Sequence, residues 1–267
     1  MTIEQTAREA TDLAKRIERL PLAPTAQELI DKKFDALNWV IPGMVTTGLT
    51  IVAGAPKVCK SWMVLNWAWA IAVGGYVLGK IRVDTNEVLY LALEDTERRL
   101  ADRLRTIGAY GSSKLYLPTQ WPKGREGIQF LDAWMIKNPD TKCVIIDTLQ
   151  KISGIEDANS YSETYAFASD LKKFADRNGI AVVVVHHTRK MEATDFLNTV
   201  QGSVGLTGAA DTIMTISKPR NEHEGVLRIT GRDVEERESG IKFEPAIGTW
   251  ELMDYVPKTS IRKGARE

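Results

Sequence analysis

From residue 48 onward the sequence alternates between short apolar runs and longer amphipathic stretches. Four runs are almost wholly apolar: 48–54, 87–93, 142–147 and 179–186. Such runs are typical of strands that are buried on both faces of a sheet. Four stretches between or before them have the spacing of helices: 60–73, 96–107, 127–137 and 161–178. This alternation predicts an α/β fold with a mostly parallel sheet, to which residues 114–117 add a weak strand.

After residue 210 the helical periodicity ends. Short strand-like runs follow one another at tight turns: 212–217, 226–230, 241–244 and 249–252. Strands that are joined by tight turns pair in the antiparallel sense. The sequence therefore predicts an antiparallel C-terminal extension of the parallel sheet.

The N-terminal residues form a separate predicted segment. Residues 3–19 have the pattern of a short charged helix, and the prolines within residues 20–26 indicate a linker. Because such a helix seldom stands alone, we expect residues 1–26 to pack on a neighbouring subunit. Residues 27–255 are expected to form the main domain, and residues 256–267 a basic, disordered tail.

The composition narrows the class of protein. Of the 267 residues, 43% are hydrophobic and 26% are charged, as in ordinary globular proteins. Lys plus Arg equals Asp plus Glu at 35 each, so any contact with nucleic acid must come from local loops. Cys59 and Cys143 have no metal-ligand spacing and imply no disulfide framework. Lacking a targeting or membrane-spanning run, the chain is expected to be cytoplasmic and to have no membrane partner.

The first chemical motif is GAPKVCKS at residues 54–61. It lies between a predicted strand and a predicted helix, as does the phosphate-binding loop G-x-x-x-x-G-K-[ST]. In that loop backbone amides surround the phosphates, the lysine binds the β- and γ-phosphates and the hydroxyl binds Mg²⁺. The motif predicts ATP and Mg²⁺ as cofactors, with Lys60 in catalysis and Ser61 as a metal ligand. The predicted nucleotide-binding residues are Gly54, Ala55, Pro56, Lys57, Val58, Cys59, Lys60, Ser61 and Trp62.

Cys59 departs from this pattern, because it stands where the motif has its second glycine. A side chain there costs about 1–3 kcal/mol if the backbone is left-handed. An incidental strand, turn and capping serine is the alternative interpretation of the whole segment. A further hypothesis is that the helix start and Lys60 lower the pKa of the Cys59 thiol and make it oxidisable.

Two acidic residues end predicted strands. Asp147 ends VIID and is expected to bind the metal, the alternative being that it caps a loop. Glu94 ends LYLALE, on a strand that should lie near that of Asp147, and is expected to orient and deprotonate the attacking water. The alternative for Glu94 is a solvated carboxylate at a helix start. Its neighbour Asp95 is expected to be the N-cap of the following helix.

His186 and His187 end the strand VVVVHH. Adjacent strand residues face opposite ways, so they cannot bind one metal together. We expect one of them to be structural. His187 is expected to contact the γ-phosphate or its water and to relay nucleotide state to the following loop; a loop histidine with local partners is the alternative.

Two long connections, 149–160 and 188–201, leave the carboxyl ends of predicted strands, where open α/β sheets bind ligands. They carry the cations Lys151, Arg189 and Lys190. Residues 188–195 contain no aromatic side chain, so base stacking is expected to be minor. Solvated charges are the alternative. The tryptophans of the 60–73 stretch are expected in core and interface packing: Trp62, Trp67 and Trp69.

Several segments, taken in order over residues 25–245, resemble the RecA-like P-loop ATPases that include the RepA-type hexameric replicative helicases of plasmids and related mobile-element ATPases. They are WVIPG, GLTIVAGAPKVCKSW, LYLALEDT, VIIDTLQK, VVVVHHTRK, QGSVGLTGAAD and LRITGRDVEE. The resemblance implies a RecA-like core in a homo-oligomeric, hexameric ring with ATP between neighbouring subunits. It assigns the catalytic base to Glu94, the metal-binding acid to Asp147 and the sensor to His187.

The resemblance also implies that a basic residue of the adjacent subunit completes the ATP pocket. Arg232 is the best match and Arg228 the second, and Asp233 is expected to orient the Arg232 guanidinium. It further implies that Lys151, Arg189 and Lys190 contact single-stranded DNA in the ring's hole. Family members have glycine at the position of Cys59, which puts the rate of hydrolysis in question.

Three functions stay open at this point. The leading hypothesis is an ATP-driven DNA helicase or translocase that acts as a ring. The second is a RecA-like ATPase that loads or remodels proteins on DNA without unwinding it. The third is a degenerate nucleotide-binding module with little turnover because of Cys59.

Overall fold

The computed structural model describes residues 3–20, 23–155, 161–188, 203–219 and 221–257. The chain divides into two compact units, Met1–Ala36 and Leu37–Glu267. The basic tail expected from residue 256 lies almost wholly outside the described residues. No helix in the described part of the chain is both long enough and apolar enough to cross a membrane.

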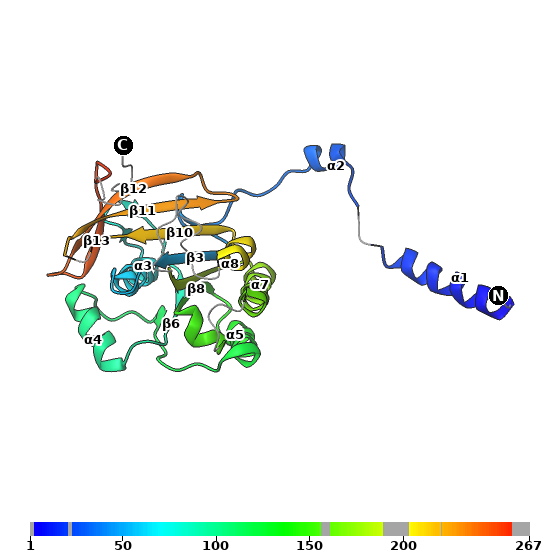
Figure 1. The fold of residues 1–267 in the computed structure, drawn as a ribbon, viewed down its shortest axis with the longest axis horizontal. Helices are drawn as coiled ribbons and strands as arrows, with labels where there is room; N and C mark the ends of the chain where they lie inside the picture. The colour runs from blue at the N-terminus through cyan, green and yellow to red at the C-terminus, as the bar shows by residue number, and fades with distance from the viewer. Residues whose placement is uncertain (1–2, 21–22, 156–160, 189–202, 220, 258–267) are drawn as a thin grey trace, which may run out of the picture. The chain divides into compact units, whose positions relative to one another are not determined.

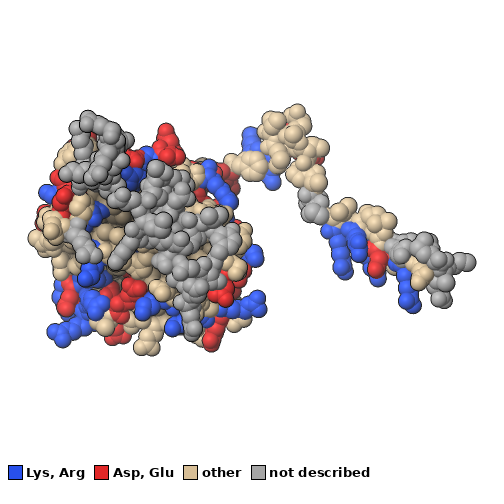
Figure 2. All heavy atoms as spheres, in the orientation of Figure 1, with Lys and Arg blue, Asp and Glu red and all other residues tan. Residues whose placement is uncertain are grey.

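The first unit contains two helices, α1 (Ile3–Glu18) and α2 (Ala26–Asp31). Basic side chains gather along one side of α1 (Figure 2). The sequence analysis did not predict α2, which begins in a capping box: Thr25 caps the helix through the amide of Glu28, whose carboxylate accepts from Thr25. Leu13 and Ile17 are exposed, so nothing within the described chain covers the apolar side of α1.

The second unit is built on a sheet of nine strands in the order β13-β12-β11-β10-β3-β9-β8-β6-β7 (Figure 1). Its strands are β3 (Gly48–Gly54), β6 (Glu87–Ala92), β7 (Leu115–Tyr116), β8 (Thr141–Asp147), β9 (Ala181–His187), β10 (Thr212–Ser217), β11 (Glu224–Gly231), β12 (Arg237–Glu244) and β13 (Thr249–Leu252). Two small hairpins lie outside it: β1 (Trp39–Ile41) with β2 (Val45–Thr46), and β4 (Tyr76–Val77) with β5 (Ile81–Arg82).

The strands from β7 to β10 are parallel, and β11, β12 and β13 continue the sheet in the antiparallel sense. The mostly parallel sheet with an antiparallel extension is therefore confirmed. One detail differs, since β10 pairs parallel with β3 and belongs to the parallel part. Sequence alone could not assign it, because the strand beside β10 in space lies far earlier in the chain.

Helices cover both faces of the sheet: α3 (Lys60–Val73), α4 (Glu97–Thr106), α5 (Gly124–Lys137), α6 (Leu149–Ser153), α7 (Tyr161–Asn178) and α8 (Ser203–Ala209). Apolar side chains of α3 and α4 pack on one face, and those of α5 to α8 on the other. In β8, Cys143 and Ile145 face the first cluster, whereas Val144 and Ile146 face the second. Burial on both faces explains why these strands are apolar throughout.

The aromatic side chains of the helices behave largely as expected. In α7, Phe167 and Phe174 are buried, as the helical periodicity predicted. Trp67 is fully buried in α3, while Trp62 and Trp69 pack against Phe243 and Tyr110. The main difference lies after β8, where α6 occupies the start of a connection that the sequence analysis interpreted as a loop.

Candidate nucleotide-binding site

The phosphate-loop motif lies at the carboxyl end of β3, the central strand that leads into α3. A Cβ on Gly54 would lie 2.8 Å from the carbonyl oxygen of Ile216 in the adjacent β10. Only glycine therefore lets β3 and β10 stay paired where the loop departs. The strand–loop–helix context that the motif requires is present.

Cys59 has the left-handed backbone that the motif's second glycine normally supplies, with φ 65° and ψ 30°. Its carbonyl oxygen accepts a hydrogen bond of 3.1 Å from the indole Nε1 of Trp250 in β13. The surrounding structure thus holds a conformation that costs a non-glycine residue about 1–3 kcal/mol. Burial raises the pKa of the Cys59 thiol, although Lys218, Arg103 and Lys60 lower it. This is opposite to the activated-thiol hypothesis.

Replacing Cys59 with glycine should raise ATP turnover, because glycine adopts the left-handed conformation without the Cβ penalty. Cys59→Ala is the matched control, since it removes the thiol and keeps the Cβ. We expect Cys59→Gly to raise the free energy of unfolding by about 1 kcal/mol and Cys59→Ala to leave turnover near that of the native protein. Equal turnover in all three proteins would mean that contacts such as that from Trp250 hold the loop at no cost to activity.

Lys60 is almost fully buried at the start of α3, with 5% of its surface exposed. Its Nζ donates to the carbonyl oxygens of Gly54 (2.7 Å) and Ala55 (3.0 Å) and lies 3.3 Å from Nδ1 of His187. Burial lowers the pKa of Lys60 to about 8, opposed by the nearby carboxylates of Asp147 and Glu94. An ammonium has three N–H donors, so every donor of Lys60 is already engaged by the protein.

Asp147 ends β8 beside this lysine and is buried, with 2% of its surface exposed. Its Oδ2 accepts a 3.0 Å hydrogen bond from the Tyr90 hydroxyl, and Oδ1 has no partner among the described residues. Burial raises the pKa of Asp147, while the side chains of Ser61 and Tyr90 lower it. A buried, unpartnered carboxylate oxygen next to a serine hydroxyl fits Mg²⁺, which takes one or two protein ligands and completes its shell with water and phosphate.

Tyr90 is a site residue that the sequence analysis missed. It lies in β6, fully buried, and burial raises the pKa of its phenol so that the group stays protonated and donates to Asp147. A tyrosine inside a wholly apolar strand was the available signal, since a buried hydroxyl needs a hydrogen-bond partner. Its partner could not be named before β6 was known to pair with β8.

Glu94 lies just beyond β6, whose last residue, Ala92, pairs with Asp147 of β8. The expected proximity of these two strands is confirmed. Oε1 of Glu94 accepts a 3.1 Å hydrogen bond from the hydroxyl of Thr148. Glu94 influences the pKa values of both Lys60 and Asp147, so its carboxylate belongs to the same electrostatic cluster.

The prediction for Asp95 was wrong. Thr96 is the N-cap of α4, and its hydroxyl accepts from the amide of Arg99. Asp95 turns inward instead, with 5% of its side chain exposed, and forms ion pairs with Arg99 and Arg103. Two arginines one turn apart on α4 compensate a buried carboxylate better than helix-start amides would.

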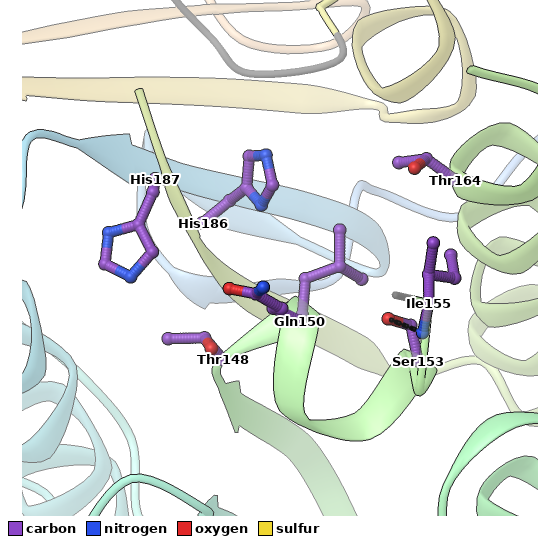
Figure 3. A pocket seen from close by; sticks show the side chains of 8 residues that line it. Thr148, Gln150, Ser153, Ile155, Thr164, His186 and His187 are labelled. Atoms are coloured by element: carbon purple, nitrogen blue, oxygen red, sulfur yellow. Dashed lines mark hydrogen bonds between the residues drawn. The ribbon is translucent and has the colours of Figure 1, made fainter. Parts of the chain in front are cut away.

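His186 and His187 project in different directions from the end of β9 (Figure 3). His186 is buried, and His187 is half-buried beside Lys60. Burial lowers the pKa of His187, and the Lys60 charge lowers it further. Since an ammonium can only donate, Nδ1 of this neutral imidazole accepts and Nε2 carries the proton.

Arg232 lies at the far end of the sheet from the phosphate loop of its own subunit. Gly231, the last residue of β11, pairs with Thr212, which pairs with Thr50. Gly54 is four residues further along β3, about 13 Å at 3.3 Å per residue. Arg232 therefore cannot reach the phosphate site of its own chain.

The partner of Arg232 is Asp211, not the expected Asp233. Nη1 of Arg232 lies 3.5 Å from Oδ1 of Asp211, and 63% of the arginine side chain is exposed. Asp211 is itself fixed, because it accepts from the amide of Leu49 (2.8 Å) and pairs with Lys172 (3.1 Å). Arg228, the second candidate, forms an ion pair with Glu238 within the sheet.

Comparisons with known proteins follow from this geometry. A family described as AAA domain matches residues 14–193, a span that includes the phosphate loop, Glu94, Asp147 and His187. The match covers more than half of the chain. The chain belongs to the AAA domain family. The comparison with curated proteins found no match.

Two solved structures are similar to this AAA domain. One is an isolated ATPase domain, with a TM-score of 0.62 and 15% identity over 78% of this chain and 85% of that one. The other is a DnaB-like replicative helicase, with a TM-score of 0.62 and 15% identity over 76% of this chain. This chain spans 57% of the length of that helicase. At such identity the likeness establishes the fold, which is that of a RecA-like P-loop ATPase domain.

The predicted DNA-contacting cations of the AAA domain are only partly described. Lys151 lies exposed on α6. Arg189 and Lys190 lie outside the described residues. The structure adds Lys218, which follows β10 and lies near Cys59 of the phosphate loop. The sequence analysis missed Lys218 because its strand had not been assigned a place beside β3.

Proposed function

We propose that this AAA domain is an ATP-hydrolysing motor that acts on DNA as a homo-oligomeric ring, most simply a replicative helicase or translocase. The observation that carries the proposal is the meeting of Lys60, Asp147, Glu94 and His187 at the carboxyl ends of β3, β8, β6 and β9. These residues come from four segments that lie far apart in the chain. Their arrangement supports phosphoryl transfer to water, which needs positioned charges and a base.

Nucleotide binding would begin with an exchange of partners at Lys60. All three donors of this ammonium are engaged by Gly54, Ala55 and His187, so a phosphate must displace at least one of them. Displacing His187 would free its Nδ1 as the β- and γ-phosphates arrive. This exchange gives His187 a physical means of sensing the nucleotide and supports its proposed role as the sensor.

The remaining groups would divide the chemistry among them. Ser61 and Asp147 would hold Mg²⁺, which supplies positive charge on the phosphate oxygens when it is bound. Glu94 would accept the proton of the attacking water. Tyr90 would keep the Asp147 carboxylate oriented, and the neutral His187 would donate from Nε2.

The position of Arg232 supports assembly into a ring. An exposed guanidinium at the opposite end of the sheet from the phosphate loop suits a head-to-tail contact, in which it would reach the ATP of a neighbouring subunit. The exposed apolar side chains of α1 and α2 support the further proposal that the N-terminal segment packs on a neighbour. DNA is proposed to contact the segments after β8 and β9, with Lys151, Arg189 and Lys190 supplying the charge.

ATPase activity measured with and without single-stranded DNA tests the proposal, together with strand displacement on a forked duplex. We expect ATP hydrolysis that DNA stimulates and that supports unwinding. DNA-stimulated hydrolysis without strand displacement would instead favour the loading or remodelling ATPase. ATP binding with little hydrolysis, with or without DNA, would favour the degenerate nucleotide-binding module.

A further inference from the structure

Thr148 occupies the N-cap position of α6, yet its side chain does not cap the helix. A threonine at this position normally accepts a hydrogen bond from a backbone amide of the first turn. In α6 no such bond forms. The hydroxyl instead donates to Oε1 of Glu94, 54 residues away in sequence and 3.1 Å away in space.

This hydrogen bond is formed in a buried setting, because only 2% of Thr148 is exposed. A glutamate side chain has several rotatable bonds, and holding one carboxylate oxygen removes most of that freedom. The held carboxylate remains close enough to influence the pKa values of Lys60, Asp147 and His187. Thr148 thus fixes Glu94 in a conformation that faces the phosphate site.

We propose that Thr148 is a positioning residue for Glu94, and that α6 controls hydrolysis by setting the orientation of the catalytic carboxylate. The proposal rests on the function proposed above. Its basis is the contact between the Thr148 hydroxyl and the Glu94 carboxylate at the start of α6.

The place of α6 gives this contact a regulatory consequence. Leu149 and Ile152 bury the helix against the same core as β8, β9 and α5, while Lys151 stays exposed on its outer side. Thr148 and His187 line the same small pocket, from the ends of β8 and β9 (Figure 3). A ligand that binds the segment after β8 and shifts α6 therefore moves the Thr148 hydroxyl, and with it the base. DNA contact and hydrolysis would be coupled through one hydrogen bond.

Kinetics of Thr148→Val and Thr148→Ser test the proposal. Valine keeps the shape and removes the hydroxyl, so kcat should fall about tenfold while KM for ATP changes less than about twofold. Serine keeps the hydroxyl and should restore kcat to within about threefold of the native value. DNA stimulation should fall in the valine variant and return in the serine variant. Thr164→Val, a buried threonine of α7 in the same pocket, is the matched control and should retain the native kcat.

A native kcat in Thr148→Val, or an equal loss in the serine and valine variants, would overturn the proposal. A double-mutant cycle tests the contact without activity. Thr148→Val should lower the melting temperature in the native background and lower it less in a Glu94→Ala background. Equal losses in both backgrounds would overturn the contact. If the native protein hydrolyses no ATP, the proposed function fails, and the cycle still decides whether Thr148 holds Glu94.

Discussion

Lys60→Ala should lower kcat for ATP hydrolysis on the order of a thousandfold and weaken ATP binding. The substitution removes the one buried ammonium beside the phosphate loop, and with it the charge proposed to stabilise the phosphoryl oxygens. Asp147→Asn should lose Mg²⁺-dependent turnover, because it removes the carboxylate charge next to Ser61. Steady-state ATPase assays over a range of Mg²⁺ concentrations, with binding of a fluorescent nucleotide measured in parallel, check both results.

The matched control is Lys142→Ala, which removes an exposed lysine from β8 and should leave hydrolysis within about twofold of the native rate. Native activity in both Lys60→Ala and Asp147→Asn would place the phosphate site elsewhere in the chain. Loss of activity with a lowered melting temperature would need the nucleotide-binding data to separate misfolding from lost chemistry.

Arg232→Ala should lower turnover about 10³–10⁵-fold, as loss of a cation supplied across a subunit boundary does. Mixing Arg232→Ala with Lys60→Ala should then restore part of the activity. An interface is complete when an Arg232→Ala subunit supplies the phosphate loop and a Lys60→Ala neighbour supplies the arginine. Random exchange makes about a quarter of the interfaces complete in a head-to-tail ring.

A mixture of Lys60→Ala with Glu94→Gln is the control, because both groups belong to the same side of an interface. No arrangement of those two subunits completes a site, so that mixture should stay inactive. Absence of restored turnover with Arg232→Ala, although subunits exchange, would contradict action across the interface. Full activity of Arg232→Ala alone would leave the arginine only its surface pairing with Asp211, worth under about 1 kcal/mol.

Much of the fold was predictable because local patterns carry it. The apolar run of β3 and the helical spacing of α3 matched the structure residue for residue, since burial on both faces leaves no polar positions to blur a strand's ends. The motif between them also fixed the phosphate loop, including the strained position of Cys59. Helix α6 was missed because its five residues are too few to show a helical period.

Partners across the sheet could not be read from the sequence. The chain alone determined that Lys60, Glu94, Asp147 and His187 each lie at the end of an apolar strand or the start of a helix. Only the tertiary structure decided that Tyr90 supports Asp147, that Asp211 and not Asp233 holds Arg232, and that Thr148 binds Glu94. Each of these contacts joins segments tens of residues apart, and the order in which strands pair depends on packing of the whole sheet. Local residue patterns carry no record of that order.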